Sequence, residues 1–250
     1  MTQPDTQPLA GQTVLITGGA RRLGAAMAQT LHGVGANVVI HHLTSSVEAA
    51  ALVSACNARR PASAIAVQAD LLDTARLPQL VAAAVLHFGR LDILINSAST
   101  FYATPIGEIA ASQFDDLIGT NVRAPLLLAQ AAAPELRQRH GLILNMVDIH
   151  GMKPLKNYPA YSAAKAALIM LTKALARELA PEVRVNGIAP GPVMWPADVD
   201  AAMQAQIIDK TLLKRSGEPQ DIGKAALYFA TLAPYVTGQI LAVDGGRSQT

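Results

Sequence analysis

The 250-residue chain has few charges, few aromatic side chains and a single cysteine. Charged residues make up 15% of it and the net charge is +2, which excludes a nucleic-acid binder that relies on a basic excess to neutralise phosphates. The lone Cys56 excludes a disulfide framework and predicts a reducing compartment, the cytoplasm. Intrinsic disorder is excluded because 51% of the residues are hydrophobic.

Long hydrophobic runs are missing as well. No stretch of about 18 apolar residues occurs, so the sequence predicts neither a membrane span nor a membrane partner. The first residues are polar and contain proline, without a signal pattern, and we expect residues 1–10 to form a mobile tail. Because no linker or change of composition follows, residues 11–250 are predicted to form one domain.

Short aliphatic runs recur along the chain and alternate with helical patterns. The runs are residues 14–16, 38–40, 65–67, 93–95, 142–144, 183–185 and 240–243. The helical patterns are residues 24–32, 47–59, 76–87, 112–139, 160–179 and 221–232. Strands that are apolar throughout are usually buried on both faces, and alternation with helices indicates βαβ units. The sequence therefore predicts an α/β fold with a parallel sheet between helices, and leaves the strand order open.

A glycine-rich turn follows the first apolar run and leads into a helix. It reads Thr17-Gly18-Gly19-Ala20-Arg21-Arg22-Leu23-Gly24. Glycines allow a tight turn and let a pyrophosphate approach the N–H groups of a helix N-terminus. We therefore expect Gly18, Arg22 and Leu23 to bind a dinucleotide, the alternative being an ordinary strand–helix turn. Arg22 stands where a glycine is common, and its guanidinium is expected to bind phosphate or to point into the cleft.

The second apolar run ends in His41 and His42, followed by Thr44 and Ser45. A cofactor with a free ribose 2′-hydroxyl usually meets an Asp or Glu at this strand end. No carboxylate occurs here before Glu48, so these four residues are expected to accept a 2′-phosphate, and NADPH is favoured over NADH. The alternative is a polar cap for the next helix, and both roles are compatible.

Polar residues also follow the third and fourth apolar runs. Asp70 and Leu71 come after the third, and Asn96, Ala98 and Ser99 come after the fourth. Taken singly, such residues are more often helix caps or turns. Because they occur in order at successive strand ends, we expect them to meet the bound dinucleotide.

Tyr161 and Lys165 lie within a long helical pattern, four residues apart and therefore on one helical face. A nearby ammonium stabilises a phenolate and lowers the phenol pKa, so such a pair can deliver a proton near neutral pH. An isolated pair of this kind is more often a surface feature. Here Asn121 precedes it on an earlier helical pattern and Asp148 follows the fifth apolar run, so we interpret the four residues as one catalytic set.

This order of motifs resembles the short-chain dehydrogenase/reductase family, over about residues 13–247. The later segments Pro190-Gly191-Pro192 and Val243-Asp244-Gly245-Gly246 fit the same pattern. The resemblance implies a Rossmann-type doubly wound sheet, a nicotinamide cofactor and a homotetramer. It also implies that the C-terminal segment around Arg247 approaches a neighbouring subunit's site.

The resemblance assigns roles to single residues. Tyr161 would donate a proton, Lys165 would hold the nicotinamide ribose and lower the tyrosine pKa, and Asn121 would fix a helix and a relay water. The family usually has a serine in place of Asp148. Further residues that the resemblance places at the cofactor are Met146, Pro190, Gly191 and Val193.

The subfamily that the chain resembles is that of the pteridine reductases. The matching segments are Asn145-Met146-Val147-Asp148, Arg21-Arg22-Leu23-Gly24, Ala58-Arg59-Arg60-Pro61, Val67-Gln68-Ala69-Asp70 and Ser97-Ala98-Ser99-Thr100-Phe101-Tyr102. An ionised Asp148 can only accept hydrogen bonds, so it suits a substrate with N–H donors better than a ketone. Thr44 departs from the pattern, because pteridine reductases often have an arginine there.

The resemblance implies a flat pterin ring stacked between Phe101 and the nicotinamide. Ser99 and Arg22 would hydrogen-bond this ring, Asp148 and Tyr161 would meet its reducible edge, and Leu155 would line the pocket. Trp195, in an irregular segment at residues 193–214, would cover the site as part of a lid. The alternatives are a buried loop aromatic for Phe101 and a plain surface connection for the segment.

We therefore predict an NADPH-dependent pteridine reductase. It would transfer hydride to the C=N bond of dihydropteridines or dihydrofolate, and to oxidised pterins as a further option, with Tyr161 and Asp148 as the proton-transfer pair. The first alternative is an NADPH-dependent reductase of carbonyls or 3-oxoacyl thioesters, which Asp148 disfavours. The second is a non-catalytic NADP-binding sensor, which would not need the Tyr161–Lys165 pair. No metal site is expected.

Overall fold

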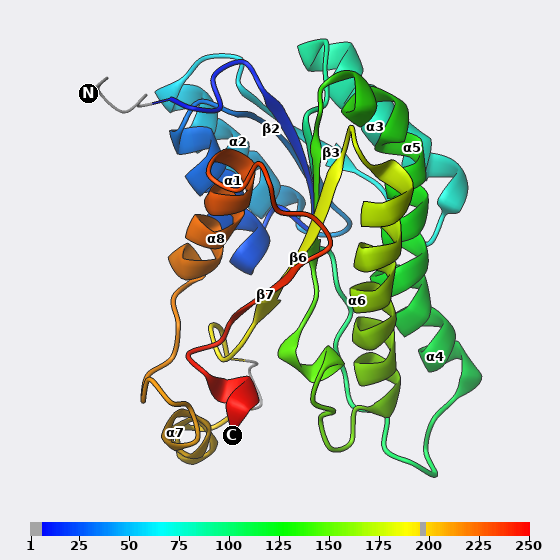
Figure 1. Ribbon diagram of the computed structural model, residues 1–250, viewed down its shortest axis with the longest axis vertical. Coiled ribbons are helices and arrows are strands. Elements are labelled where there is room, and N and C mark those ends of the chain that lie inside the picture. Colours follow the sequence, from blue (N-terminus) through cyan, green and yellow to red (C-terminus); the bar gives the residue numbers. More distant parts are fainter. Residues whose placement is uncertain (1–6, 196–198) are drawn as a thin grey trace.

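The computed structural model describes residues 7–195 and 199–250, in which seven strands form one sheet (Figure 1). They are β1 (Thr13–Thr17), β2 (Asn37–His42), β3 (Ala64–Gln68), β4 (Ile93–Asn96), β5 (Leu142–Met146), β6 (Arg184–Pro190) and β7 (Ile240–Val243). The order is β3-β2-β1-β4-β5-β6-β7, and every neighbouring pair is parallel. Each apolar run of the sequence falls on one strand, although the run at 183–185 begins one residue before β6. The predicted Rossmann-type α/β fold is thus confirmed.

Helices cover both faces of the sheet (Figure 1). On one face lie α1 (Arg22–Gly33), α2 (Ser46–Arg59) and α8 (Pro219–Thr231), and on the other lie α3 (Leu77–Phe88), α5 (Ala124–Gln138) and α6 (Pro159–Leu179). Shorter elements are α4 (Ala111–Ile118), α7 (Ala201–Asp209), and the 3-10 turns η1 (Thr74–Arg76), η3 (Ile149–Gly151) and η4 (Arg247–Gln249). Within the described residues, no helix combines the length and apolar character needed to cross a membrane.

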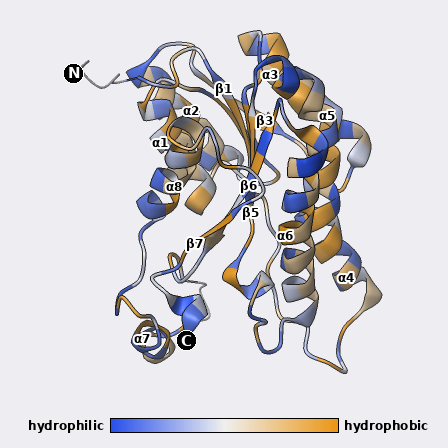
Figure 2. Cartoon of the chain, viewed as in Figure 1, coloured by the Kyte–Doolittle hydropathy of each residue, from blue (hydrophilic) through white to orange (hydrophobic). Residues whose placement is uncertain are grey.

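Each face of the sheet has its own apolar core, as the hydrophobic colouring of the strands indicates (Figure 2). Successive side chains of a strand point to opposite faces, so Ile16 packs in the core shared with α1 and α8, whereas its neighbour Leu15 packs in the core shared with α3 and α5. The middle strands β1, β4 and β5 are buried along their whole length, while the edge strands β3 and β7 are partly exposed. Burial on both faces explains why the middle strands are mostly apolar.

Two expectations about the chain's organisation need correction. Within the expected mobile tail, residues 1–6 lie outside the described residues, but Leu9 is 1% exposed and packs in the core, where its N–H donates to the Val34 carbonyl. The predicted continuous helix at 112–139 is interrupted by a π-helical turn, η2 (Gly119–Arg123), between α4 and α5. This wider turn contains Asn121, and such turns are frequent at functional sites.

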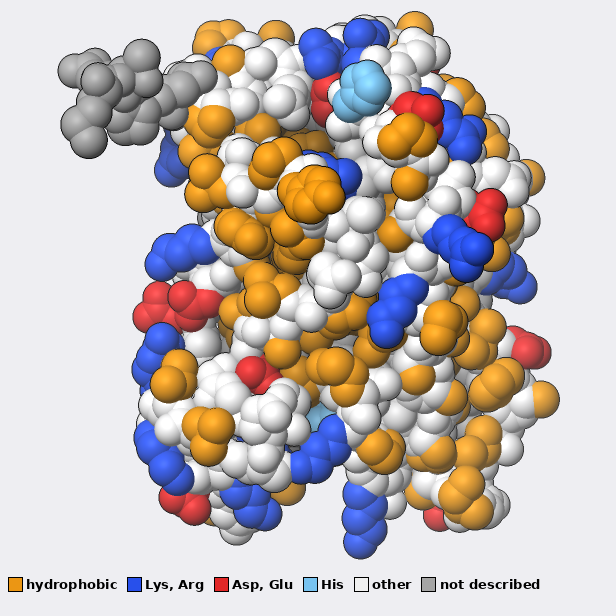
Figure 3. Space-filling model, in the orientation of Figure 1, with side chains coloured by type: hydrophobic (Ala, Val, Ile, Leu, Met, Phe, Trp, Pro, Cys, Tyr) orange, Lys and Arg blue, Asp and Glu red, His pale blue; other side chains and the backbone are white. Residues whose placement is uncertain are grey.

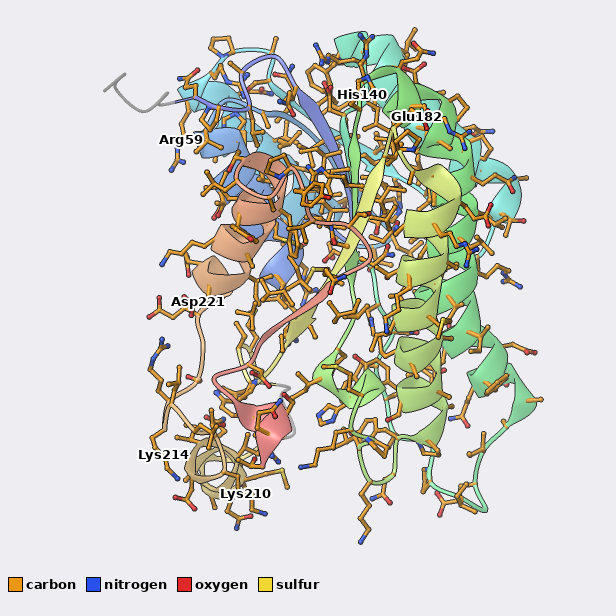
Figure 4. The ribbon with its side chains drawn as sticks, viewed as in Figure 1. Arg59, His140, Glu182, Lys210, Lys214 and Asp221 are labelled. Carbon is orange, nitrogen blue, oxygen red and sulfur yellow. The ribbon has the colours of Figure 1, made fainter. Side chains whose placement is uncertain are left out.

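The strand order places the candidate site. The chain winds outward from β1 to β3 and returns to β4, which lies on the other side of β1, so the sheet has a switch point between β1 and β4. In open α/β sheets, ligands bind at this point, beyond the carboxyl ends of the strands. Gly18, Ser97 and Val147 begin the loops that leave β1, β4 and β5 at this edge. His140 and Glu182 mark the opposite edge of the sheet (Figure 4).

Candidate functional site

The glycine turn after β1 is tightly packed. Gly18 has φ +60°, a left-handed conformation, and a Cβ built on it would lie 2.9 Å from the Ala98 Cα atom. A Cβ on Gly24 would lie 2.2 Å from the Gly18 carbonyl oxygen. The turn leads into α1, whose first N–H groups have no acceptor within the helix. Only glycines allow this close approach, and the exposed helix end can receive a phosphate.

The two arginines of this turn point in different directions. Arg22 has φ +52°, strained for a residue with a side chain, and its Nη2 atom donates to the Met194 carbonyl 3.4 Å away, beyond β6. Its guanidinium therefore extends from the turn to the segment after β6, and its contacts with cofactor and substrate stay predictions. Arg21 instead lies 3.7 Å from Glu48 in the first turn of α2. Sequence reasoning did not single out Arg21, although its neighbour was chosen.

His41 differs from the expectation that its ring faces the cofactor. It is 2% exposed, its Nδ1 accepts a hydrogen bond from the Gly18 N–H at 3.2 Å, and its Nε2 donates to the Ala69 carbonyl at 3.0 Å. Both nitrogens are thus bound to backbone. His42 is also buried, and its Nδ1 atom has no hydrogen-bond partner among the residues that the structure describes. Thr44 is exposed, and Ser45 precedes α2 without a side-chain cap bond.

The loops after β1 and β4 are joined through Thr17, which sequence reasoning missed. Its Oγ1 atom accepts from the N–H groups of Ser97 and Ala98, at 3.0 and 3.1 Å. A threonine at the end of the first strand, directly before the glycine turn, was the available signal. Ala98 is thereby fixed beside Gly18, at the point where the sheet changes direction.

A buried polar chain connects β4, β5 and α6. Asn96 Nδ2 donates to Asn145 Oδ1 at 2.8 Å, and Asn145 Nδ2 donates to Thr172 Oγ1 at 2.9 Å. Thr172 in turn donates to the Leu168 carbonyl. Buried amides must be paired to avoid a desolvation penalty, so this chain fixes the three elements relative to one another. Of the predicted residues, only Asn96 lies in it, and its Oδ1 atom has no partner in the described structure.

Tyr161 and Asp148 are brought together as predicted. The Tyr161 hydroxyl donates to Asp148 Oδ2 at 2.7 Å, and the other carboxylate oxygen accepts from the His150 N–H at 2.8 Å. Asp148 thereby caps η3, the turn after β5, and Tyr161 comes from the first turns of α6. The cap holds the carboxylate so that it faces the phenol across the end of the sheet.

The pKa of Tyr161 is raised well above 10, whereas we expected Lys165 to lower it. Burial is the main cause, followed by the charge of Asp148 and the hydrogen bond to it, because all three disfavour the phenolate. A hydrogen bond with the Ser99 hydroxyl acts in the opposite direction. In this arrangement Tyr161 holds its proton firmly at neutral pH, as a proton donor must before the reaction begins.

Lys165 is buried beneath the tyrosine. Its Nζ atom donates to the Met146 carbonyl at 2.9 Å and lies 5.6 Å from the centroid of the Tyr161 ring. Burial lowers the pKa of Lys165 to about 8, and Asp148 acts in the opposite direction. The ammonium carries three donors, so the bond to Met146 leaves donors free for other oxygens.

Asn121 lies in the π-turn and contacts Ser99. Its Oδ1 accepts from Ser99 Oγ at 2.7 Å, and its Nδ2 donates to the Leu117 carbonyl at 3.0 Å and to the Thr100 carbonyl at 3.2 Å. The Asn121 side chain therefore connects the loop after β4 to the C-terminal end of α4. This agrees with the expected helix-fixing role, while the relay water stays a prediction.

Phe101 is 42% exposed and lies edge-on to Tyr161, with ring centroids 4.8 Å apart. Its ring stacks on Tyr158, at 4.7 Å and 12° between planes. Tyr158 was not singled out from the sequence, although it lies three residues before Tyr161. Leu155, the other predicted lining residue, is half-buried, and its N–H donates to Ser162 Oγ.

The segment expected to form a lid is described for residues 193–195 and 199–214, and Pro196 lies outside the described residues. Val193 is buried and Trp195 is half-buried. α7 follows and has no buried residue, and Lys210 and Lys214 lie at its outer end (Figure 4). The chain end holds this segment, because the Leu213 N–H donates to the Gly245 carbonyl at 3.0 Å. Closure over a substrate stays a prediction.

The remaining predicted cofactor residues lie at the ends of β3 and β6. Asp70 is exposed and caps its own turn through the Leu72 N–H, and Leu71 is buried. Pro190 ends β6, and Gly191 packs against Asp244, where a Cβ would lie 2.5 Å from the Asp244 Cα atom. Leu23 is half-buried at the start of α1.

A nicotinamide dinucleotide fits this edge of the sheet on chemical grounds. The glycine turn and α1 offer N–H groups for a pyrophosphate, the Lys165 ammonium offers donors for ribose hydroxyls, and Tyr161 marks the reacting end. Among the residues that the structure describes, His, Cys, Asp and Glu do not gather in groups of three or more that could hold a metal.

Comparisons with known proteins agree with this geometry. The family model described as enoyl-(acyl carrier protein) reductase matches residues 18–248. Pteridine reductase 1 of Leishmania tarentolae is 37% identical over 291 residues, which cover 100% of this chain and 99% of the relative. A 3-oxoacyl-(acyl-carrier-protein) reductase of Staphylococcus epidermidis is 33% identical, covering 94% and 98%, and an oxidoreductase of Methylorubrum extorquens is 35% identical, covering 95% and 98%. The chain belongs to the short-chain dehydrogenase/reductase family and is an oxidoreductase with a nicotinamide cofactor.

Proposed function

We propose that the protein is an NADPH-dependent pteridine reductase that reduces a C=N bond of a dihydropteridine or dihydrofolate. The observation that carries the proposal is the 2.7 Å hydrogen bond from the Tyr161 hydroxyl to Asp148. It puts an ionisable acceptor beside the proton donor, where the family usually has a serine. The 37% identity with a pteridine reductase over the whole chain supports the same assignment.

The proton chemistry follows from these two side chains. A bound nicotinamide cofactor would supply a hydride to the carbon of the C=N bond. The Tyr161 O–H bond breaks and a new N–H bond forms on the substrate nitrogen. The resulting phenolate is stabilised by the Lys165 ammonium, and it regains a proton from solvent through Asp148. Asp148 also accepts hydrogen bonds from N–H groups of the heterocycle, which a pterin offers and a ketone lacks.

A flat ring is a suitable occupant beside Phe101. Tyr158 covers one face of the Phe101 ring, which stays partly exposed next to Tyr161. Offset stacking of aromatic rings contributes roughly 0.5–1.5 kcal/mol beyond the burial of area. Arg22 and Ser99 lie at the same edge and are proposed to hydrogen-bond the ring.

The proposed preference for NADPH rests on the residues at the end of β2 and the start of α2, where the adenosine ribose is expected to bind. β2 ends without a carboxylate, and Arg21 lies beside the first turn of α2, in ion-pair range of Glu48. A guanidinium there provides the positive charge that Thr44 lacks for a 2′-phosphate. We therefore propose that Arg21, together with Thr44 and Ser45, receives the 2′-phosphate.

Reduction of a 3-oxoacyl thioester is the second candidate, favoured by the 33% identity with a reductase of that class. The Asp148 carboxylate argues against it. Negative charge develops on a carbonyl oxygen during hydride transfer, and a carboxylate beside it would raise the barrier rather than lower it.

A substrate panel tests the proposal. NADPH oxidation is followed with dihydrobiopterin, dihydrofolate, an acetoacetyl thioester and a quinone, and each reaction is repeated with NADH. We expect turnover of the pterins and at least tenfold higher kcat/KM with NADPH than with NADH. Turnover of the thioester alone would establish the second candidate, and binding without any turnover would indicate a sensor.

The variant Asp148→Ser restores the residue usual in the family and sharpens the test. We expect pterin turnover to fall by more than tenfold, because Tyr161 and the substrate N–H groups lose the two-oxygen carboxylate acceptor and face a shorter, neutral hydroxyl. Asp116→Ser is the matched control, since Asp116 accepts from the Tyr102 hydroxyl at 2.8 Å in a second Tyr–Asp pair outside the reacting groups. Unchanged pterin turnover in Asp148→Ser would remove the main support for the proposal.

The proposed assembly is a homotetramer. Apolar side chains gather over α8 and β7 in the space-filling view (Figure 3). The exposed apolar side chains of α8, β7 and the loop between them include Tyr228, Leu232, Tyr235 and Leu241, which are at least 37% exposed in the single chain. A patch of this kind commonly marks an interface. The approach of Arg247 to a neighbouring site, and a cytoplasmic location based on the lone Cys56, remain part of the proposal.

A further inference from the structure

His41 is a buried histidine whose two ring nitrogens have opposite hydrogen-bonding roles. The Gly18 N–H can only donate, so Nδ1, 3.2 Å away, must be the acceptor. The Ala69 carbonyl can only accept, so Nε2, 3.0 Å away, must carry the hydrogen. One tautomer of the neutral imidazole satisfies both partners. A doubly protonated ring would set a second N–H against that of Gly18.

Gly18, which donates to the His41 ring, belongs to the glycine turn after β1. The next N–H of the turn, that of Gly19, donates to the His41 carbonyl at 2.9 Å, so one residue of β2 fixes both glycines. On the other side, Thr17 fixes the loop after β4. With Gly18 and Gly19 bound in this way, the N–H groups at the start of α1 are the ones left to meet a phosphate.

We propose that His41 is a positioning residue for the nicotinamide dinucleotide: its neutral imidazole, held between Gly18 and Ala69, keeps the glycine turn in the conformation that receives the pyrophosphate. The residue does not touch the cofactor and acts through the Gly18 N–H. The inference rests on the cofactor part of the proposed function and is independent of the pterin assignment.

A pH dependence of dinucleotide binding follows from this geometry. Burial, the main cause, lowers the pKa of His41 below its ordinary value of 6.5, with His42 acting in the same direction and Asp70 beyond β3 acting against it. Arg21 and Arg22 of the turn are exposed to solvent, as is Glu48 of α2. His41 is therefore neutral at pH 7, and protonation of its ring, which requires a pH below this lowered pKa, would break the contact with Gly18.

Two substitutions separate the two contacts of the ring. In His41→Asn, the amide oxygen takes the place of Nδ1 and keeps an acceptor for Gly18 but loses the donor to Ala69. In His41→Gln, the longer amide keeps a donor for Ala69 but loses the acceptor for Gly18. Each variant loses one buried hydrogen bond, so a purely structural role predicts similar losses in both.

The measurement is calorimetric titration of the full chain with NADP+, with thermal unfolding of each variant recorded alongside. We expect the Kd of His41→Asn to stay within threefold of wild type and that of His41→Gln to rise about tenfold, at similar unfolding temperatures. Equal Kd values in the two variants, or the reverse order, would overturn the inference. Wild-type protein that binds no NADP+ would overturn the proposed cofactor as well.

The acid titration of NADP+ binding runs from pH 7.5 down to the lowest pH at which circular dichroism shows the protein to be folded. The 2′-phosphate itself titrates near pH 6, so His41→Asn, which cannot gain a proton, is the reference. We expect the wild-type Kd to rise at least threefold more than that of His41→Asn over this range. Parallel curves would contradict the proposed role of the neutral ring.

Discussion

At the glycine turn the groups proposed to face the cofactor are backbone N–H groups, whereas at the Tyr161 end of the site they are side chains. The conformation of Gly18 and the start of α1 depends on close packing and on hydrogen bonds made by Thr17 and His41. Tyr161 and Asp148 depend on each other, at 2.7 Å. A site built from backbone N–H groups tolerates a change of side chain as long as the backbone conformation is kept. A site built from side-chain groups loses its function when one of those groups is removed, even if the backbone is unchanged. Variants at the two ends should therefore fail in different ways.

Tyr161→Phe tests the side-chain end and should have the largest effect. Without the hydroxyl, no group of the protein delivers the proton, and we expect kcat to fall by at least 1,000-fold. The Kd for NADP+ should change less than threefold, because the glycine turn is untouched. Single-turnover kinetics and calorimetric titration measure the two quantities.

Tyr102→Phe is the matched control for this variant. Tyr102 also donates to a carboxylate, that of Asp116, and its pKa is raised to about 12. The Tyr102→Phe variant should therefore keep kcat within a few-fold of wild type. Equal losses in the two variants would mean that the aromatic cluster around Tyr161, and not its proton, limits the reaction.

Gly18→Ala tests the backbone end. The added Cβ would lie 2.9 Å from Ala98 Cα in a left-handed conformation that costs roughly 1–2 kcal/mol for a residue with a side chain. We expect the Kd for NADP+ to rise by about 10- to 100-fold, with kcat at saturating cofactor within threefold of wild type. Gly107→Ala is the control, because Gly107 has φ +99° but no atom within 4 Å of its Cβ position. A loss of kcat without a loss of affinity in Gly18→Ala would remove the contrast between the two ends.

Features that depend on local sequence patterns could be predicted from the sequence, whereas features that depend on tertiary packing could not. The strands followed from the apolar runs, and the pairing of Tyr161 with Asp148 followed from the resemblance to the reductase family; the structure has both. His41 could not be placed correctly, because whether a ring faces a ligand or the backbone depends on tertiary packing that a strand-end position does not reveal. The π-turn at Asn121 was missed because the one-residue shift that it causes in the apolar positions is hidden by the alanines and leucines that begin α5.

The direction in which the pKa of Tyr161 is shifted also depends on tertiary packing. The sequence shows a lysine four residues away but gives no distances, and in the structure burial and Asp148 outweigh it. The lysine's effect is therefore expected on the phenolate formed during the reaction and not on the resting phenol. This separates the roles of Asp148, which holds the proton donor, and Lys165, which stabilises what remains after the proton has left.

The alkaline pH profile tests that separation and should show the smallest effect. The pKa of Lys165 is lowered to about 8, so the ammonium is present below pH 8 and lost above it, and with it the stabilisation of the phenolate. We expect kcat at saturating NADPH to fall by several-fold between pH 7.5 and 9.5. Lys165→Arg, whose side chain stays charged, should lose this alkaline limb at whatever activity it retains, whereas Lys173→Arg on the exposed side of α6 should keep it. A wild-type profile that is flat to pH 9.5 would mean that the charge of Lys165 is not used in the proton transfer, and the role of this buried ammonium would then reduce to holding the ribose and the Met146 carbonyl.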